Sequence, residues 1–170
     1  MIRTATRHTS DFADIIGRLQ ALLPRSQPCL RLKNILVPID FTESSLRSVS
    51  YASFLANQFA CTIFLVHVVQ LNIAGEERGV PLKCLLDEMK SAAERALQEV
   101  VSSLGVATTR VVVRVGSPAD QILREAAESD IDLIVLGRHR RKGIWDSFSP
   151  SVGKKIIGQA PCPTLVAAQN

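Results

Sequence analysis

From Asn34 to residue 168, short apolar runs alternate with longer segments whose apolar residues recur every three to four positions. The short runs predict buried strands, and the three-to-four spacing predicts helices. Strands and helices that alternate along a chain are typical of βαβ units, in which helices cover both faces of a parallel sheet. We therefore expect an α/β fold.

Turn residues bound each expected element. The expected strands are residues 35–39, 62–69, 110–115, 131–136 and 163–168. The expected helices run from a Thr42 or Ser44 cap to Phe59, from Leu82 to Leu104, from a Ser117 cap to Ser129, and from a Ser151 cap to Gly158. Helical spacing predicts buried side chains at Leu46, Val49, Ala52, Phe54 and Leu55, and in the next helix at Leu85, Met89, Ala93 and Leu97.

Two strand patterns carry further expectations. Arg110 and Arg114 alternate with valines, which predicts that one face of the third strand reaches solvent at a sheet edge. His67 lies in the second strand, and a lone histidine there is more often held by a backbone or side-chain partner than catalytic.

A chain of 170 residues can bury a core of its own as one domain. Its four cysteines form no CxxC or Cys/His spacing, so we expect neither a zinc site nor a disulfide framework, and mostly buried, reduced thiols. No apolar run approaches the roughly 20 residues of a membrane helix, and the N-terminus lacks the apolar core of a secretory signal. We expect a soluble, cytoplasmic protein without membrane contact.

The first 32 residues follow a different pattern. Apolar residues on one face predict an amphipathic helix over residues 10–23, and Pro24 to Pro28 then form a linker. We expect an N-terminal extension at residues 1–32 and the folded domain at residues 33–170. An Arg-rich amphipathic start is also typical of organelle transit segments, but Asp11 and Asp14 count against that alternative.

Positive charge is concentrated in two places. Residues 1–32 carry a net charge of +3, residues 137–155 carry +5, and the remainder carries −4. The second patch begins with the glycine-flanked loop Gly137–Gly143, between an expected strand and an expected helix, where α/β proteins hold phosphates. This distribution favours a particular anion over a long polyanion, so we expect no nucleic-acid partner.

Four segments, in order, resemble universal stress protein (UspA-like) domains. They are residues 34–44 (NILVPIDFTES), 65–69 (LVHVV), 116–118 (GSP) and 160–166 (APCPTLV). The resemblance implies a Rossmann-like, adenine nucleotide alpha hydrolase-like fold: a five-stranded parallel sheet of order 3-2-1-4-5 with two helices on each face. Ligands of such sheets bind beyond the carboxyl ends of the strands, where the strand order reverses. Asp40 and Gly137 stand at the two strand ends that border this crevice.

In family members that bind ATP, the loop after the fourth strand resembles the pattern Gly-x-x-Gly, nine residues, then Gly-Ser or Gly-Thr. Here the first glycine is Gly137, Arg140 and Pro150 replace the other two, and the hydroxyl residue is Ser151. These losses weaken a backbone cradle for phosphate, whereas nearby arginines can bind phosphate through their side chains. The implied nucleotide-binding residues are Pro38, Ile39, Asp40, Val68, Gly137, Arg138, Arg140, Gly143, Ser151 and Val152.

Two of these assignments have structural alternatives. The resemblance makes Asp40 the acid on the adenine or ribose side and Val68 the residue whose backbone meets adenine. Asp40 could instead be a cap or turn residue, and the cation run could be a solvated loop that needs no ligand.

The resemblance implies a regulatory or protective module in the stress response, with weak or altered binding of ATP, accompanied by Mg²⁺, or of another adenine nucleotide. The alternative is a nucleotide-free dimeric module that works through contacts with a protein partner. The family also implies a homodimer through the last strand. The sequence shows no nucleophile elbow, Walker lysine or paired carboxylates, so at most slow ATP hydrolysis is expected, with no catalytic or metal-ligating residue of its own.

Overall fold

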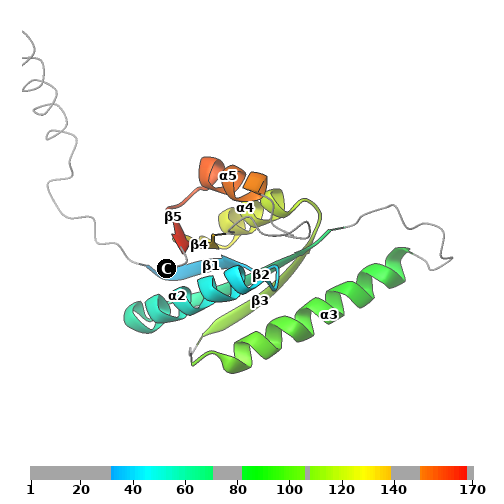
Figure 1. The fold of residues 1–170 in the computed structure, drawn as a ribbon, viewed down its shortest axis with the longest axis horizontal. Coiled ribbons are helices and arrows are strands. Elements are labelled where there is room, and N and C mark those ends of the chain that lie inside the picture. The colour runs from blue at the N-terminus through cyan, green and yellow to red at the C-terminus, as the bar shows by residue number, and fades with distance from the viewer. Residues whose placement is uncertain (1–31, 71–81, 106–107, 139–149, 168–170) are drawn as a thin grey trace, which may run out of the picture. The chain divides into compact units, whose positions relative to one another are not determined.

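The computed structural model describes residues 32–70, 82–105, 108–138 and 150–167, all within a compact unit that begins at Leu32 (Figure 1). The expected helix at residues 10–23 lies outside the described residues, and the extension at residues 1–32 stays a prediction. The elements are β1 (Asn34–Pro38), α2 (Glu43–Phe59), β2 (Thr62–Val69), α3 (Leu82–Ser103), β3 (Thr109–Val115), α4 (Pro118–Glu128), β4 (Leu133–Gly137), α5 (Pro150–Gln159) and β5 (Thr164–Ala167).

The five strands form one parallel sheet of order β3-β2-β1-β4-β5, which confirms the expected topology. β1 is central and pairs with β2 on one side and β4 on the other. The strand order reverses between β1 and β4. In open α/β sheets this reversal opens a crevice at the carboxyl ends of the strands.

Each face of the sheet has its own apolar core, because successive side chains of a strand point to opposite faces. Ile35, Val37 and Leu65 pack beneath α2 and α3, whereas Leu36 and Val66 pack beneath α4 and α5. Figure 1 shows these two helix pairs on opposite sides of the sheet. The two helices per face are therefore confirmed.

Several residues expected to be buried are exposed. Phe54 is 64% exposed and Leu46 40%, because the buried stripe of α2 consists of small residues: Ser45, Ser48, Val49, Ala52 and Ala56. α3 packs through Ala93 and Leu97, while Leu85 and Met89 in its first turns are exposed. Cys84 is also exposed, Cys162 is half-buried and Cys61 is buried, so the expectation of mostly buried thiols is wrong for Cys84.

The solvent-reaching face expected for β3 is covered in part by α4. Val112 packs against the core on that side, and the Arg110 guanidinium lies 5.4 Å from the centre of the Phe64 ring. Arg114 forms ion pairs with Glu125, which is buried, and with Glu128. The hydrogen bonds that the Arg114 guanidinium donates to the Glu125 carboxylate are the main reason that the pKa of Arg114 is raised.

None of the helices in the described ranges combines the length and the apolar character needed to cross a membrane.

Candidate functional site

The candidate site is the crevice that the reversal of strand order predicts at the carboxyl edge of the sheet, between the ends of β1 and β4. Ile39 extends the pairing of β1 by one step, since its N–H donates to the Val66 carbonyl oxygen at 2.8 Å. Asp40 follows immediately and is partly buried, and Gly137 ends β4. The first turn of α2 closes this end of the sheet.

Asp40 forms a tight turn at the start of α2. Its Oδ1 accepts hydrogen bonds from the Thr42 backbone N–H at 3.0 Å and from the Thr42 hydroxyl at 2.6 Å. Thr42 in turn caps α2, because its Oγ1 accepts from the Ser45 N–H at 3.3 Å. Asp40 thus has the turn role that the sequence left open, and of the two expected caps Thr42 is the correct one.

Gly137 is required by close packing between β4 and α2. A Cβ at this position would lie 2.7 Å from the Ser44 Oγ and closer still to the Ser44 carbonyl group. Real Cβ atoms do not approach backbone atoms this closely, so glycine is the residue that lets α2 seat against the strand end. The sequence analysis did not predict the contact between Gly137 and Ser44. A glycine at a strand end opposite a helix start could have indicated such a close contact.

Val68 presents its backbone to the crevice. Val66 directs its carbonyl oxygen toward β1, and residues two apart in a strand direct their backbone polar groups to the same side. The N–H and C=O of Val68 therefore point past the end of β1, beyond Ile39. The Val68 side chain is buried in the core beneath α4 and α5. Pro38 is buried at the end of β1, and Ile39 is buried in the core on the opposite face, beneath α2 and α3.

His67 has a backbone partner, as the sequence predicted. Its Nδ1 lies 2.8 Å from the Ile39 carbonyl oxygen, and its ring lies against the Phe41 ring with centroids 4.9 Å apart. Phe41 has a φ of 63°, in the left-handed region, and is 38% exposed. The prediction did not identify Phe41 or the carbonyl that His67 contacts, because both lie in a different segment of the chain.

The phosphate side of the predicted site is only partly within the described residues. Arg138 is exposed, and its N–H donates to the Ala167 carbonyl oxygen at 3.1 Å. Arg140 and Gly143 lie outside the described residues. α5 begins at Pro150, so Ser151 lies inside the helix and the expected cap at Ser151 is wrong. Val152 packs against the core beneath α4 and α5.

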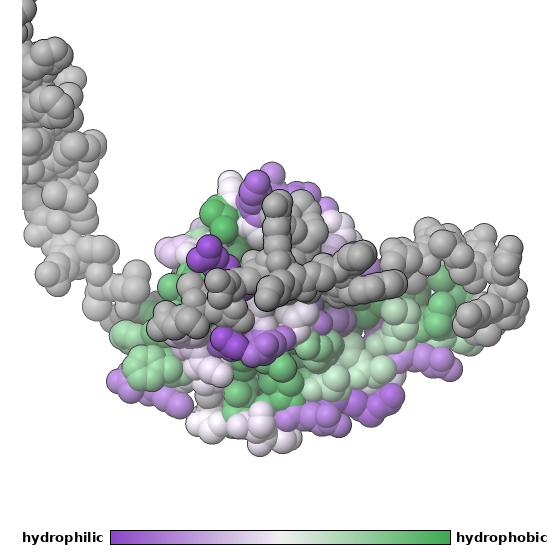
Figure 2. Space-filling view, viewed as in Figure 1, coloured by the Kyte–Doolittle hydropathy of each residue, from purple (hydrophilic) through white to green (hydrophobic). Residues whose placement is uncertain are grey.

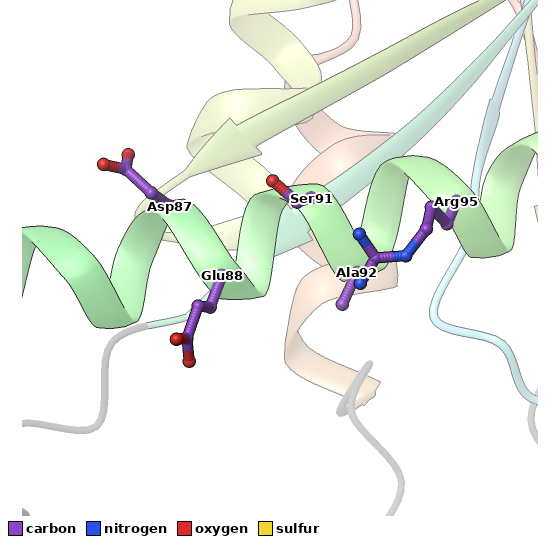
Figure 3. Close-up of a pocket in the computed structure, with 5 residues that line it drawn as sticks. All are labelled: Asp87, Glu88, Ser91, Ala92 and Arg95. Atoms are coloured by element: carbon purple, nitrogen blue, oxygen red, sulfur yellow. The ribbon is translucent and has the colours of Figure 1, made fainter.

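Two surface hollows involve α2 and α3. One runs between α2 and α3 and is lined by Phe41, Leu46 and Val49 from the α2 side and by Ala96, Val100 and Leu104 from the α3 side. Figure 3 shows the other, whose lining residues Asp87, Glu88, Ser91, Ala92 and Arg95 all come from α3. Over the described ranges, no group of three or more His, Cys, Asp or Glu side chains could hold a metal ion.

Comparison with known proteins assigns the family. The profile of the universal stress protein family matches residues 31–168. A universal stress protein of Methanocaldococcus jannaschii is 27% identical over 138 residues, which cover 79% of this chain and 81% of the relative.

Two solved structures of family members were obtained with nucleotides. One, a universal stress protein in complex with cAMP, has a TM-score of 0.60 and 19% identity, covering 82% of this chain and 98% of that one. The other, from Arabidopsis thaliana with AMP bound, has a TM-score of 0.55 and 18% identity, covering 81% of this chain and 92% of that one. At these identities the likeness concerns the fold. The family profile spans most of the chain, and the chain therefore belongs to the universal stress protein family.

Proposed function

We propose that this universal stress protein binds an adenine nucleotide in the β1–β4 crevice and acts as a regulatory or protective module of the stress response. The observation that carries the proposal is the meeting of Asp40, the Val68 backbone and Gly137 at one edge of the sheet. Relatives with the same fold have been solved with cAMP and with AMP.

The adenosine half of the ligand would lie against β1 and β2. The Val68 N–H and C=O, which point past β1, suit the hydrogen-bonding edge of adenine, and Pro38 and Ile39 form the buried end of β1 next to them. Asp40, whose Oδ1 already accepts from Thr42, is the carboxylate that we assign to an adenine or ribose donor.

The phosphate half would lie toward β4 and α5. Arg140 and Pro150 stand where the family pattern has glycines, so we assign phosphate binding mainly to arginine side chains, Arg138 and Arg140, rather than to backbone amides. Gly143, Ser151 and Val152 complete the proposed set. This arrangement predicts weak or altered affinity for a triphosphate.

If the ligand is ATP, Mg²⁺ would come with it. Mg²⁺ keeps several waters and binds through the phosphates of its nucleotide, so the ion would enter with the ligand and is assigned to no metal-ligating residue of this chain. The ion would neutralise phosphate charge.

Calorimetric titration of the full chain with ATP, ADP and cAMP at millimolar concentration tests the proposal. We expect heat from at least one nucleotide and a loss of about tenfold in affinity in Arg138→Ala, because a charged hydrogen bond to phosphate is lost. Arg124→Ala is the matched control, since Arg124 is an exposed arginine of α4 whose partner is Glu128. Absence of heat, together with no displacement of a fluorescent nucleotide, would contradict nucleotide binding.

The exposed edge strand β5 favours a second proposal, a homodimer that works through protein contacts. Leu165 and Val166 are 40% and 42% exposed, on a strand that pairs with β4 along its other edge. An apolar edge strand of this kind is a template for pairing with a second copy. We expect sedimentation to show a dimer for the unmutated chain and a monomer for the Val166→Lys variant. Ile157→Lys, at an exposed apolar residue of α5, is the control. Monomer at high concentration in the unmutated chain would reject the dimer.

A further inference from the structure

We infer that His67 is a positioning residue that holds Asp40 in place for the ligand, an inference that rests on the proposed nucleotide site. His67 was not part of the predicted set of binding residues. Its imidazole touches both neighbours of Asp40 in the chain: Nδ1 is bonded to the Ile39 carbonyl oxygen, and the ring lies against Phe41.

The Ile39 contact sets the tautomer of His67. A carbonyl oxygen only accepts hydrogen bonds, so Nδ1 must carry the proton and donate it to Ile39. Ile39 is then held through both of its backbone groups, because its N–H also donates to Val66 at 2.8 Å. The backbone entering Asp40 is thus fixed to β2 after the β1 ladder has ended.

The Phe41 contact fixes the backbone that leaves Asp40. A left-handed conformation costs a residue with a Cβ roughly 1–2 kcal/mol, so Phe41 needs compensating contacts. The tilted contact with His67, with ring planes at 43°, is one of them. This backbone reversal brings Thr42 back over the Asp40 carboxylate, where its N–H and hydroxyl reach Oδ1.

These contacts link His67 to the Asp40 side chain through the backbone. His67 holds Ile39 and Phe41, their backbone conformation places the Asp40 turn, and the turn sets the Asp40 carboxylate against Thr42 at the carboxyl edge of the sheet. His67 itself lies on the α2 side of β2, opposite the face that carries Val66 and Val68. It therefore acts on the ligand through Asp40 and not by contact.

The test compares the nucleotide affinities of three variants and one control variant. His67→Leu removes the donor and the ring, and we expect affinity to fall by about fivefold to tenfold, as for loss of one hydrogen bond at the site. His67→Asn keeps an N–H donor near the place of Nδ1 and should recover most of that loss. Phe41→Leu should weaken binding, whereas Phe59→Leu, at an exposed aromatic at the far end of α2, should not.

A double-mutant cycle separates positioning from a purely structural role. If His67 acts through Asp40, then His67→Leu should cause little further loss in a chain that already carries Asp40→Ala. The inference is wrong if the two substitutions lower nucleotide affinity by independent factors that multiply, or if His67→Asn binds nucleotide as weakly as His67→Leu.

Hydrogen exchange of the nucleotide-free protein keeps this inference separate from the proposed function. In His67→Leu the amides of residues 40–45 should exchange at least fivefold faster, while those of β3 stay unchanged. Unchanged exchange at residues 40–45 would overturn the positioning role even if nucleotide binds. If the unmutated chain binds no nucleotide, the proposed function fails, and the exchange of residues 40–45 alone decides whether His67 holds the turn.

Discussion

Two aspartates lie at the opposite ends of β1, and their hydrogen bonds differ in the sequence separation of the residues that they join. At the amino edge, Asp132 Oδ2 accepts from the backbone N–H groups of Lys33 and Asn34 at 2.8 and 2.9 Å, so it ties the start of β4 to the start of β1. At the carboxyl edge, Asp40 Oδ1 accepts from Thr42, two residues further along the chain.

The difference separates a stability role from a binding role. Asp132 joins segments almost 100 residues apart in sequence, so its loss weakens the sheet itself. The Asp40 bonds are local and stabilise a turn at the edge where open α/β sheets bind ligands. We therefore expect substitutions at the amino edge to change the free energy of unfolding, and Asp40 substitutions to change mainly ligand affinity.

The largest effect is expected where packing, not hydrogen bonding, forms the carboxyl edge. Gly137→Ala should lower the free energy of unfolding by about 3 kcal/mol, because the new Cβ meets the Ser44 backbone and α2 must move. Denaturant unfolding measures this. Gly153→Ala is the control, since no atom lies within 4 Å of a Cβ there and alanine favours the helix. Equal free energies of unfolding for the two variants would show that α2 can shift at little cost in stability.

Asp132→Ala should destabilise the protein by about 2 kcal/mol, since two backbone N–H groups lose their acceptor. Nucleotide affinity should stay within about twofold, because the substitution lies at the other end of the sheet. Denaturant unfolding and calorimetry check the two parts. Asp87→Ala, on the exposed surface of α3, should change neither. A large loss of affinity in Asp132→Ala would remove the distinction between the two edges.

Asp40→Ala should show the reverse pattern. We expect about 1 kcal/mol of destabilisation from the lost turn bonds, but at least a tenfold loss of nucleotide affinity. The same two measurements apply. A variant that loses stability but keeps full affinity would assign Asp40 to the turn alone.

The smallest effect is expected at Glu128, which joins α4 to the edge strand β3. Hydrogen bonds from Arg124 and then Arg114 hold the pKa of Glu128 below its ordinary value of 4.5. Because the pKa of Glu128 is lower in the folded protein than in the unfolded chain, ionised Glu128 stabilises the fold above pH 4.5. This stabilisation is lost as the pH falls through the pKa of the folded state. The free energy of unfolding should therefore fall slightly less on acidification in Glu128→Gln than in the unmutated chain. A steeper acid loss in the variant would contradict this sign.

Local patterns predicted the elements well. The bounds of β2 were predicted without error, and α2 ends at Phe59 as expected, where Ala60 takes a left-handed cap. The Thr42 cap and the proline that opens α4 were also readable, since capping depends on residues within one turn of each other.

Burial and partners were less predictable. Phe54 and Leu46 look like core residues by type, but small side chains form the stripe that α2 turns toward the sheet. The Arg114–Glu125 pair was missed because its members come from different elements, 11 residues apart in sequence. Ser151 is not the cap that the sequence predicted, because α5 starts at Pro150, two residues before the start that a Ser151 cap implies.

The sequence by itself determined the parallel α/β fold, the strand order through its family pattern, and the position of Asp40 and Gly137 at adjoining strand ends. Periodicity and capping are properties of neighbouring residues, so one chain segment suffices to read them. Only the tertiary structure decided that Ser44 closes on Gly137 and that His67 holds both neighbours of Asp40. Those contacts join separate segments, and their geometry exists only once the sheet has placed β1, β2 and β4 side by side.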